Sequence, residues 1–308
     1  MIGRYSNMYY QTRWVPLRRR GLGWHRCNVL FKDHKCVASC GLAYGKVLEL
    51  VLDVKGCNLN CKYCWCWKMR HGEEILKYPE DVLRDLECRF DEVSRDFFVS
   101  RKGYRVGVIR ITGNEPSLQW DHVFELLKLI DRSKLNGCKV IVETNGILFG
   151  MGRVSFEGLD ELEIDIDIDV SFKGVNYDQF EWLSSSRREY FRYQIEGFVK
   201  LFDYYEGSNV NVNPVLGINH AENYCVWRGR RYVMDVEIVD ERGEKLDFYE
   251  YSEDFENEVL SRRELRYDEA PFREYFGINR DTARLVVAVV YEGKRFLHVL
   301  PSEIPDLV

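Results

Sequence analysis

The sequence lacks any apolar run long enough to cross a membrane, which takes about 20 predominantly apolar residues. The apolar stretch Leu48–Val54 is interrupted by Glu49 and Asp53. The stretch Met1–Gln11 is polar and aromatic and has no apolar core of the kind found in signal peptides. Internal repeats and low-complexity tracts are missing as well. We therefore expect a globular protein that stays in the cytoplasm and has no membrane partner.

The chain also lacks the positive charge expected of a protein that binds nucleic acid over its whole surface, since its formal net charge is -6. The charge is uneven, however. Residues 1–46 contain nine basic residues and one acidic residue, Asp33, so this segment carries +8 and the remainder -14. Aromatic residues such as Trp14 and Trp24 are interleaved with the basic ones. Two interpretations stay open: a segment that tracks a phosphate backbone, or a solvated arm lying on an acidic body.

Disulfide bonds are not expected, although the chain has ten cysteines, because cytoplasmic thiols stay reduced. Metal binding is the better expectation. Cys57, Cys61 and Cys64 are spaced C-x3-C-x2-C directly after a strand-like segment. Three thiolates on a tight loop suit a cubane iron–sulfur cluster with one iron left open. A closed zinc site with Cys66 as a fourth ligand is the alternative.

Strand-like and helix-like segments alternate from Val47 onward, which predicts an α/β protein with a parallel sheet, open or curled into a partial barrel. The expected helices begin at Pro79, cover Val123–Ile130 and cover Tyr190–Tyr205. After about Cys225 the pattern changes to two predicted β-hairpins, within Tyr232–Tyr251 and Arg284–Leu300. The expected strands are Val47–Val54, Val106–Ile111, Lys139–Glu143, Leu162–Val170 and Asn209–Val215.

Three landmarks in this order resemble the signature of the radical S-adenosylmethionine (SAM) superfamily. The cysteine motif has the aromatic Tyr63 before its last cysteine, and Gly113-Asn-Glu-Pro116 stands where the family has Gly-Gly-Glu-Pro. Glu143-Thr-Asn-Gly146 matches a stretch common in the glycyl-radical-activase-like branch. The resemblance covers roughly residues 47–220. In detail, the sequence is similar to an archaeal group of radical SAM proteins without an assigned reaction.

This resemblance implies a partial (βα)6-type radical SAM barrel at residues 47–224. A basic, cysteine-containing segment (1–46) precedes it and a β-rich extension (225–308) follows it. It also implies a [4Fe-4S] cluster on Cys57, Cys61 and Cys64, with SAM chelated at the open iron. A reductant such as ferredoxin or flavodoxin would then drive cleavage of SAM to methionine and a 5′-deoxyadenosyl radical, which abstracts hydrogen from the substrate.

The resemblance further assigns contacts to SAM. The side chain of Tyr63 is expected near the adenine, and the backbone around the Gly-Asn-Glu-Pro turn at the amino group. Asn114 replaces the second glycine of the family motif, which changes how closely the backbone can approach. The residues expected to contact SAM or the substrate are Tyr63, Thr112, Gly113, Asn114, Glu115, Glu143 and Asn145.

Polar residues alternate with apolar ones along several of the predicted strands. Strands covered on both faces usually read as continuous apolar runs, so this alternation predicts a wetted inner face that holds SAM and a polar substrate. We expect Asp169, Ser171 and Lys173 to be catalytic and Asn213 to lie beside the cofactor. The alternative is that the acids lie on exposed edges or pair with arginines in a purely structural role. The alternating acids are Glu161, Glu163, Asp165, Asp167 and Asp169.

Cys27, Cys36 and Cys40 lie within the basic segment, close to His25 and His34. These soft ligands suit a second metal site, either an auxiliary iron–sulfur cluster or zinc; cysteines buried as small apolar residues are the plain alternative. Three cysteines ahead of the main motif are similar to the radical SAM enzymes of wybutosine synthesis, which act on tRNA.

The sequence thus predicts a radical SAM enzyme that acts on a polar metabolite or a protein side chain in preference to tRNA. A tRNA-modifying enzyme of the wybutosine type is one alternative, and a non-catalytic zinc-binding module is another.

Overall fold

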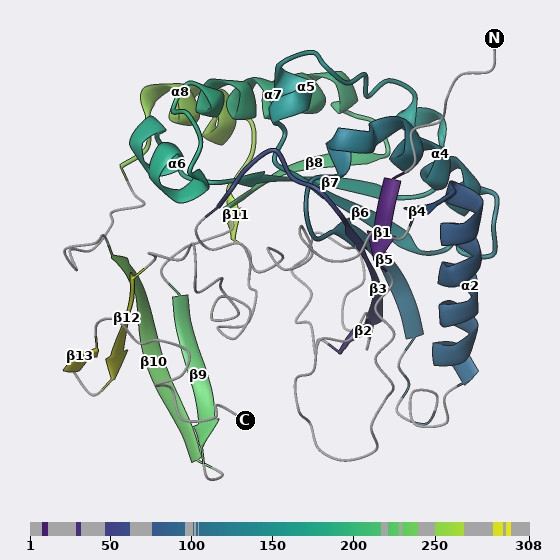
Figure 1. Cartoon of the computed structure of the whole chain (residues 1–308), viewed down its shortest axis with the longest axis horizontal. Coiled ribbons are helices and arrows are strands. Elements are labelled where there is room, and N and C mark those ends of the chain that lie inside the picture. Colours follow the sequence, from purple (N-terminus) through teal and green to yellow (C-terminus); the bar gives the residue numbers. More distant parts are fainter. Residues whose placement is uncertain are drawn as a thin grey trace.

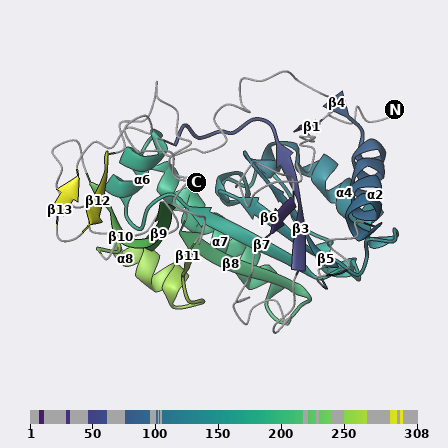
Figure 2. The same ribbon diagram turned by 90° about the horizontal axis from the view of Figure 1, so that it is seen from below.

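The computed structural model of the chain describes residues 8–11, 29–31, 47–61, 76–95, 101, 103, 105–216, 221–227, 230–239, 250–267, 286–291 and 294–296. The main sheet of the described chain has its strands in the order β11-β8-β7-β6-β5-β3-β1-β4, with β2 also beside β3. Figure 2 shows the central strands of this sheet lying side by side.

Five strands of this sheet form a continuous parallel block, in the order β8-β7-β6-β5-β3. The short β11 continues the parallel order beyond β8, whereas β1 and β2 run antiparallel to β3. This α/β arrangement with five parallel strands is consistent with a partial radical SAM barrel. The strands are β1 (Met8–Gln11), β2 (Val29–Phe31), β3 (Val47–Val54), β4 (Leu76–Lys77), β5 (Arg105–Thr112), β6 (Lys139–Thr144), β7 (Ile166–Phe172), β8 (Val210–Leu216) and β11 (Arg266–Tyr267).

The helices follow the outer side of the curved sheet, with α2 and α4 beside β5 and β3 and with α5, α6, α7 and α8 along the β7 and β8 side (Figure 1). Their apolar faces are buried with one face of the strands in a single hydrophobic core. The helices are α2 (Pro79–Arg95), α4 (Trp120–Asp131), α5 (Ile147–Gly150), α6 (Tyr177–Ser184), α7 (Tyr190–Tyr205) and α8 (Glu253–Phe255), with 3-10 turns η2 (Pro116–Gln119) and η3 (Leu159–Glu161) and the π-helical turn η4 (Glu256–Leu260).

Several predicted elements are confirmed at their ends. β3 covers Val47–Val54, α2 begins at Pro79 and α7 covers Tyr190–Tyr205, as the residue pattern indicated. Pro79 suits the first turn because that turn leaves its backbone N–H groups without helical partners. In α7 the buried residues recur at helical spacing, as Phe191, Ile195 and Phe198 do.

The prediction of a strand over Leu162–Val170 is wrong at its start, because β7 begins at Ile166. Glu161 lies in the 3-10 turn η3. The backbone N–H groups of Glu163 and Ile164 donate to the side chain of Asp131 at 2.8 and 3.0 Å, which takes them out of any strand ladder. Of the predicted row of acids, only Asp167 and Asp169 therefore lie on the strand.

Glycines allow α5 and α7 to cross at backbone contact. A Cβ atom on Gly150 would lie 1.9 Å from the carbonyl oxygen of Tyr193, and one on Gly197 would lie 2.0 Å from the carbonyl oxygen of Gly146. No other residue type fits at either position without moving the helices apart. The crossing holds the turn after β6 against α7.

A segment beyond residue 250 packs on the main core. Phe255 is fully buried, and its ring meets that of Phe172 edge-on with centroids 4.9 Å apart. The side chain of Asn176 donates to the carbonyl oxygen of Glu250 at 2.7 Å, and β11 then pairs with β8. The range predicted as an extension thus supplies part of the core beneath the parallel strands.

The remaining described strands form a separate antiparallel sheet in the order β13-β12-β10-β9. The predicted hairpin in the range Arg284–Leu300 is confirmed by the pairing of β12 (Val286–Tyr291) with β13 (Lys294–Phe296). The turn and most of the second strand of the other predicted hairpin lie outside the described residues. Its first strand is described: β10 (Arg230–Val239) pairs with β9 (Ala221–Trp227), the strand before it, which was not predicted. Among the described residues, no helix is long and apolar enough to cross a membrane.

Candidate functional site

The cysteine loop begins where β3 ends. Cys57 and Cys61 are both half-buried and in no disulfide bond, and the backbone N–H of Leu59 donates to the sulfur of Cys57 at 3.4 Å. An N–H group directed at sulfur favours the thiolate, the form that binds metal. The loop is fixed from below by the buried side chain of Leu59 and by a hydrogen bond from the backbone N–H of Asn60 to the carbonyl oxygen of Ser184, 3.1 Å long.

The Gly113–Pro116 turn after β5 is held by the carboxylate of Glu115, which is 1% exposed. One of its oxygens accepts from the backbone N–H and hydroxyl of Ser117 at 3.0 and 2.6 Å and from the hydroxyl of Thr144 at 2.5 Å. The other accepts from the backbone N–H of Asn145 at 2.7 Å. Gly113 has a φ of +97°, a conformation that favours glycine and turns the chain toward Glu115.

The side chains of Asn114 and Asn145, both expected to contact SAM or the substrate, have partners within the protein. Asn114 donates from Nδ2 to the carbonyl oxygen of Val54 at 2.9 Å, so its side chain ties the turn to the end of β3. Asn145 donates from Nδ2 to the side chain of Asn58 at 2.6 Å and accepts from the backbone N–H of Ile147 at 3.1 Å. The bond to Asn58 fixes the cysteine loop, and the bond from Ile147 holds the first residue of α5.

The carboxyl end of β7 is joined to the Asn145 turn by Gln194 of α7, which is fully buried. Its Nε2 donates to the carbonyl oxygens of Asn145 and Ser171 at 2.7 and 3.0 Å, and its Oε1 accepts from the backbone N–H of Lys173 at 3.1 Å. Ser171 is half-buried on β7, and Lys173 follows just after β7 ends at Phe172.

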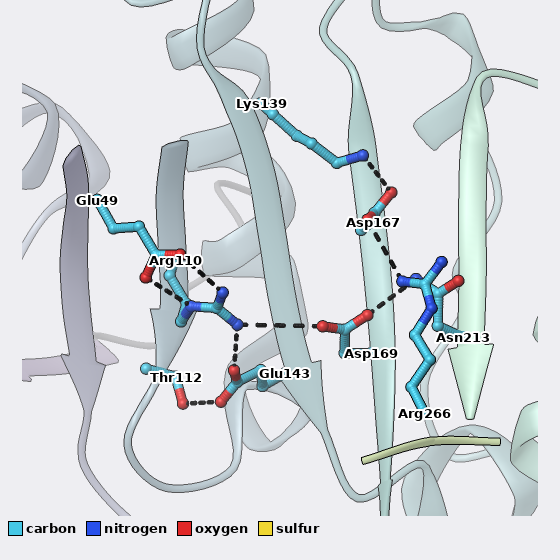
Figure 3. Close-up of polar contacts among 9 residues, drawn as sticks. All are labelled: Glu49, Arg110, Thr112, Lys139, Glu143, Asp167, Asp169, Asn213 and Arg266. Carbon is cyan, nitrogen blue, oxygen red and sulfur yellow. Dashed lines mark hydrogen bonds and ion pairs between the residues drawn. The ribbon is translucent and has the colours of Figure 1, made fainter. Parts of the chain in front are cut away.

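Charged and polar side chains on the face of the sheet away from the helices form the Arg110 array: Arg110, Glu49, Glu143, Thr112 and Asp169 (Figure 3). Arg110 donates from Nε and one terminal nitrogen to the two oxygens of Glu49, at 3.2 and 3.0 Å. Its other terminal nitrogen donates to Glu143, which also accepts from the hydroxyl of Thr112. That same nitrogen lies 4.0 Å from Asp169. Burial acts to lower the pKa of Arg110, but Glu143 and Glu49 outweigh it and raise that pKa well above its ordinary value.

Asp169 and Asn213 face each other across β7 and β8, where they are direct partners in register. Asn213 is fully buried and donates from Nδ2 to Asp169 at 2.9 Å. Burial raises the pKa of Asp169 to about 6, although Arg110 and the Asn213 hydrogen bond act in the opposite direction. Two residues before Asp169 on β7, Asp167 pairs with Lys139 at 2.8 Å.

The structure thus brings the predicted site residues together in two groups. Thr112, Glu143, Asp169 and Asn213 belong to the polar face, whereas Gly113, Asn114, Glu115 and Asn145 surround the cysteine loop. Tyr63, Cys64, Cys27, Cys36 and Cys40 lie outside the described residues. No group of three histidine, cysteine or acidic side chains suited to a metal occurs among the residues that are described; the loop contributes two cysteines to that part.

Two residues central to these contacts were not predicted as site residues. The binding of Arg110 to carboxylates on other strands could not be read from one sequence. Gln194 was detectable in principle, because it is a polar residue on the otherwise apolar face of α7. A buried amide at such a position needs hydrogen-bond partners.

Comparison with known proteins gives two relatives from Methanocaldococcus jannaschii, each 28% identical to the chain. The protein named "Putative glycyl-radical enzyme activating enzyme MJ1632" matches over 140 residues, 44% of this chain and 44% of its own. The one named "Putative glycyl-radical enzyme activating enzyme MJ1227" matches over 103 residues, 33% of this chain and 35% of its own. The matched part therefore spans less than half of either relative.

Among solved structures, the chain is similar to SuiB from Streptococcus suis. The alignment covers 74% of this chain and 50% of SuiB at 12% identity, with a TM-score of 0.37. SuiB bound to S-adenosylmethionine aligns over 56% of this chain and 34% of its own at 18% identity, with a TM-score of 0.35.

The family comparison covers more of the chain than either archaeal relative does. The model of the radical SAM superfamily matches residues 51–224, which is more than half of the 308 residues. This range includes the cysteine loop and both turns that contact it. The chain therefore belongs to the radical SAM superfamily.

Proposed function

We propose that the protein cleaves SAM reductively at a [4Fe-4S] cluster and uses the resulting radical to abstract hydrogen from a polar substrate. Cys57, Cys61 and Cys64 would hold the cluster, which leaves one iron for SAM. When bound, this pair of cofactors supplies the electron transfer and the radical chemistry. The chain's own residues position the cofactors and the substrate.

The observation that carries this proposal is the linkage of three sequence motifs at one end of the sheet. The backbone N–H of Glu115 donates to the carbonyl oxygen of Gly56 at 2.9 Å, which joins the Gly-Asn-Glu-Pro turn to the cysteine loop. Asn145 joins the same loop through Asn58 and the same turn through Glu115. A closed zinc knuckle needs only its four ligands, whereas a loop that presents a cluster to a nucleotide needs fixed neighbours.

The polar face supplies the substrate site in this proposal. Asp169, Ser171 and Lys173 would act on the substrate, with Asn213 holding Asp169. In parallel α/β proteins, ligands bind at the carboxyl ends of the strands. Asp169 and Ser171 lie in the second half of β7, toward the same end as the cysteine loop.

The test is anaerobic reconstitution with iron and sulfide, reduction, and measurement of 5′-deoxyadenosine formed from SAM. We expect formation by the full chain and none by the Cys57→Ala variant. Iron near four per chain fits one cluster, and iron near eight would support a second cluster on Cys27, Cys36 and Cys40. One equivalent of zinc without iron after anaerobic purification, together with no 5′-deoxyadenosine, would favour the zinc module instead.

A protein substrate is the second candidate within this proposal, and the names of the two archaeal relatives favour it. In this version the abstracted hydrogen comes from a residue of a partner protein. Extract from the source cells would be separated by size into a protein fraction and a small-molecule filtrate. Formation of 5′-deoxyadenosine above the substrate-free level with the protein fraction alone supports a protein substrate, and stimulation by the filtrate alone supports a metabolite.

A further inference from the structure

Arg110 lies on the polar face of β5 with acidic partners on three other strands. A guanidinium presents five N–H donors in one plane, so a single side chain can bind several carboxylates in fixed directions. Here its partners are Glu49 on β3, Glu143 on β6 and Asp169 on β7 (Figure 3). The arginine side chain is 17% exposed, so these charges interact in a largely desolvated setting.

The hydrogen bonds divide the three carboxylates into two kinds. Both oxygens of Glu49 accept from Arg110, and the two oxygens of Glu143 accept from Arg110 and Thr112. Asp169 differs, because one of its oxygens accepts from Asn213 while Oδ2 lies 4.0 Å from Arg110, beyond hydrogen-bond distance. Asp169 Oδ2 is thus the carboxylate oxygen of the Arg110 array that lies near the arginine charge but accepts no hydrogen bond from Arg110.

The charged groups around Asp169 make its ionisation depend on Arg110. Glu143 and Asp167 act to protonate Asp169, as burial does. On the opposite side stand Arg110 and the Asn213 donor, and Arg263 interacts with Asp169 at longer range. Arg266 contacts Asp167, 3.9 Å away, and not Asp169 itself. Arg110 is therefore the cation that most directly opposes protonation of Asp169.

We propose that Arg110 is a positioning residue of the active site, which fixes Glu49 and Glu143 and keeps Asp169 ionised with Oδ2 directed at the substrate. This inference rests on the proposed function, because it takes the polar face as the substrate site. An ionised, half-satisfied carboxylate is suited to a hydrogen-bond donor on the substrate, above all a protonated amine.

The test is an infrared pH titration of the reconstituted full-length protein, in which the protonated carboxyl band of Asp169 is assigned by its loss in Asp169→Asn. The wild-type band should titrate near pH 6. In Arg110→Gln its midpoint should rise by about one to three pH units, because an opposite charge at this distance has been removed. Arg110→Lys should restore most of the wild-type midpoint, since it returns the charge.

Lys139→Met is the matched control, because it removes another buried cation of the same face, one that pairs with Asp167. Its Asp169 midpoint should stay close to that of wild type. If Arg110→Gln does not fold, the double variant Glu49→Gln/Arg110→Gln removes one carboxylate with the arginine, and the same upward shift is expected. An unchanged midpoint in every folded variant that lacks the Arg110 charge would overturn the inference.

The titration needs neither SAM cleavage nor a known substrate. A normal 5′-deoxyadenosine assay with an unshifted midpoint would therefore refute the role of Arg110 and leave the proposed function intact. A shifted midpoint without 5′-deoxyadenosine formation would refute the proposed function and leave only the effect of Arg110 on the ionisation of Asp169.

Discussion

The buried carboxylate of Glu115 offers the sharpest test of how the turns at the cysteine loop are held. Replacing it by glutamine preserves its size but exchanges one acceptor oxygen for an NH2 group. The hydroxyls of Ser117 and Thr144 can rotate to accept from that group. The backbone N–H groups of Ser117 and Asn145 cannot, and they bind opposite oxygens of Glu115.

Either orientation of a glutamine amide therefore leaves one backbone N–H facing another donor. An unpaired buried donor costs about 1 to 3 kcal/mol, and the remaining bonds lose the strengthening that a charged acceptor gives. We expect Glu115→Gln to lower the free energy of unfolding by about 3 kcal/mol, a loss that corresponds to a fall in Tm of roughly 5 °C.

Urea unfolding followed by tryptophan fluorescence measures this change, and a thermal melt gives an independent value. Glu125→Gln is the matched control, because the side chain of Glu125 on α4 is 39% exposed and its pair with Lys128 is 3.3 Å long and in contact with solvent. We expect it to change stability by less than about 0.5 kcal/mol. If Glu115→Gln melts together with this control, the carboxylate does not hold the turns as described.

Three further predictions concern other parts of the molecule. Asp169→Asn should stabilise the fold more at pH 8 than at pH 4. The pKa of Asp169 in the folded protein, about 6, is above its ordinary value of 3.8, so the ionised acid destabilises the fold. This cost is absent below pH 3.8, grows between the two pKa values and is complete above pH 6, where it reaches about 3 kcal/mol. Equal effects in urea titrations at both pH values would contradict the raised pKa. Gly150→Ala should prevent close packing of α5 on α7 and lower the free energy of unfolding by more than about 3 kcal/mol. Gly137→Ala is the control, because no atom lies within 4 Å of its added Cβ, and it should leave the thermal melt almost unchanged. Similar melts for the two variants would argue against a backbone crossing. Gln194→Met keeps the side-chain volume but leaves two carbonyl groups and one N–H without their partner, so it should lower the urea midpoint strongly. A midpoint equal to that of wild type would mean that Gln194 does not join β7 to the Asn145 turn.

The fold of the parallel region followed closely from the residue pattern, because local physics sets it. Alternating β-branched stretches, Pro79 at a helix start and the spacing of apolar residues in Tyr190–Tyr205 act within a few residues of one another. The prediction failed at the start of β7, where a distant side chain intervenes. Asp131 binds the backbone before β7 and delays that strand. This contact is not visible in the local sequence.

For the site, the sequence by itself determined which chemical groups are present and in which order. The cysteine spacing, the Gly-Asn-Glu-Pro turn and the Glu-Thr-Asn-Gly turn indicated the superfamily, and the match to residues 51–224 bears this out. Tertiary structure alone decided which groups meet. Glu115 reaches Asn145, and Arg110 reaches Glu49 and Glu143, because parallel strands bring side chains separated by about 30 to 60 positions to neighbouring places in register. A hydrogen bond depends on distance in space, and one sequence fixes only distance along the chain.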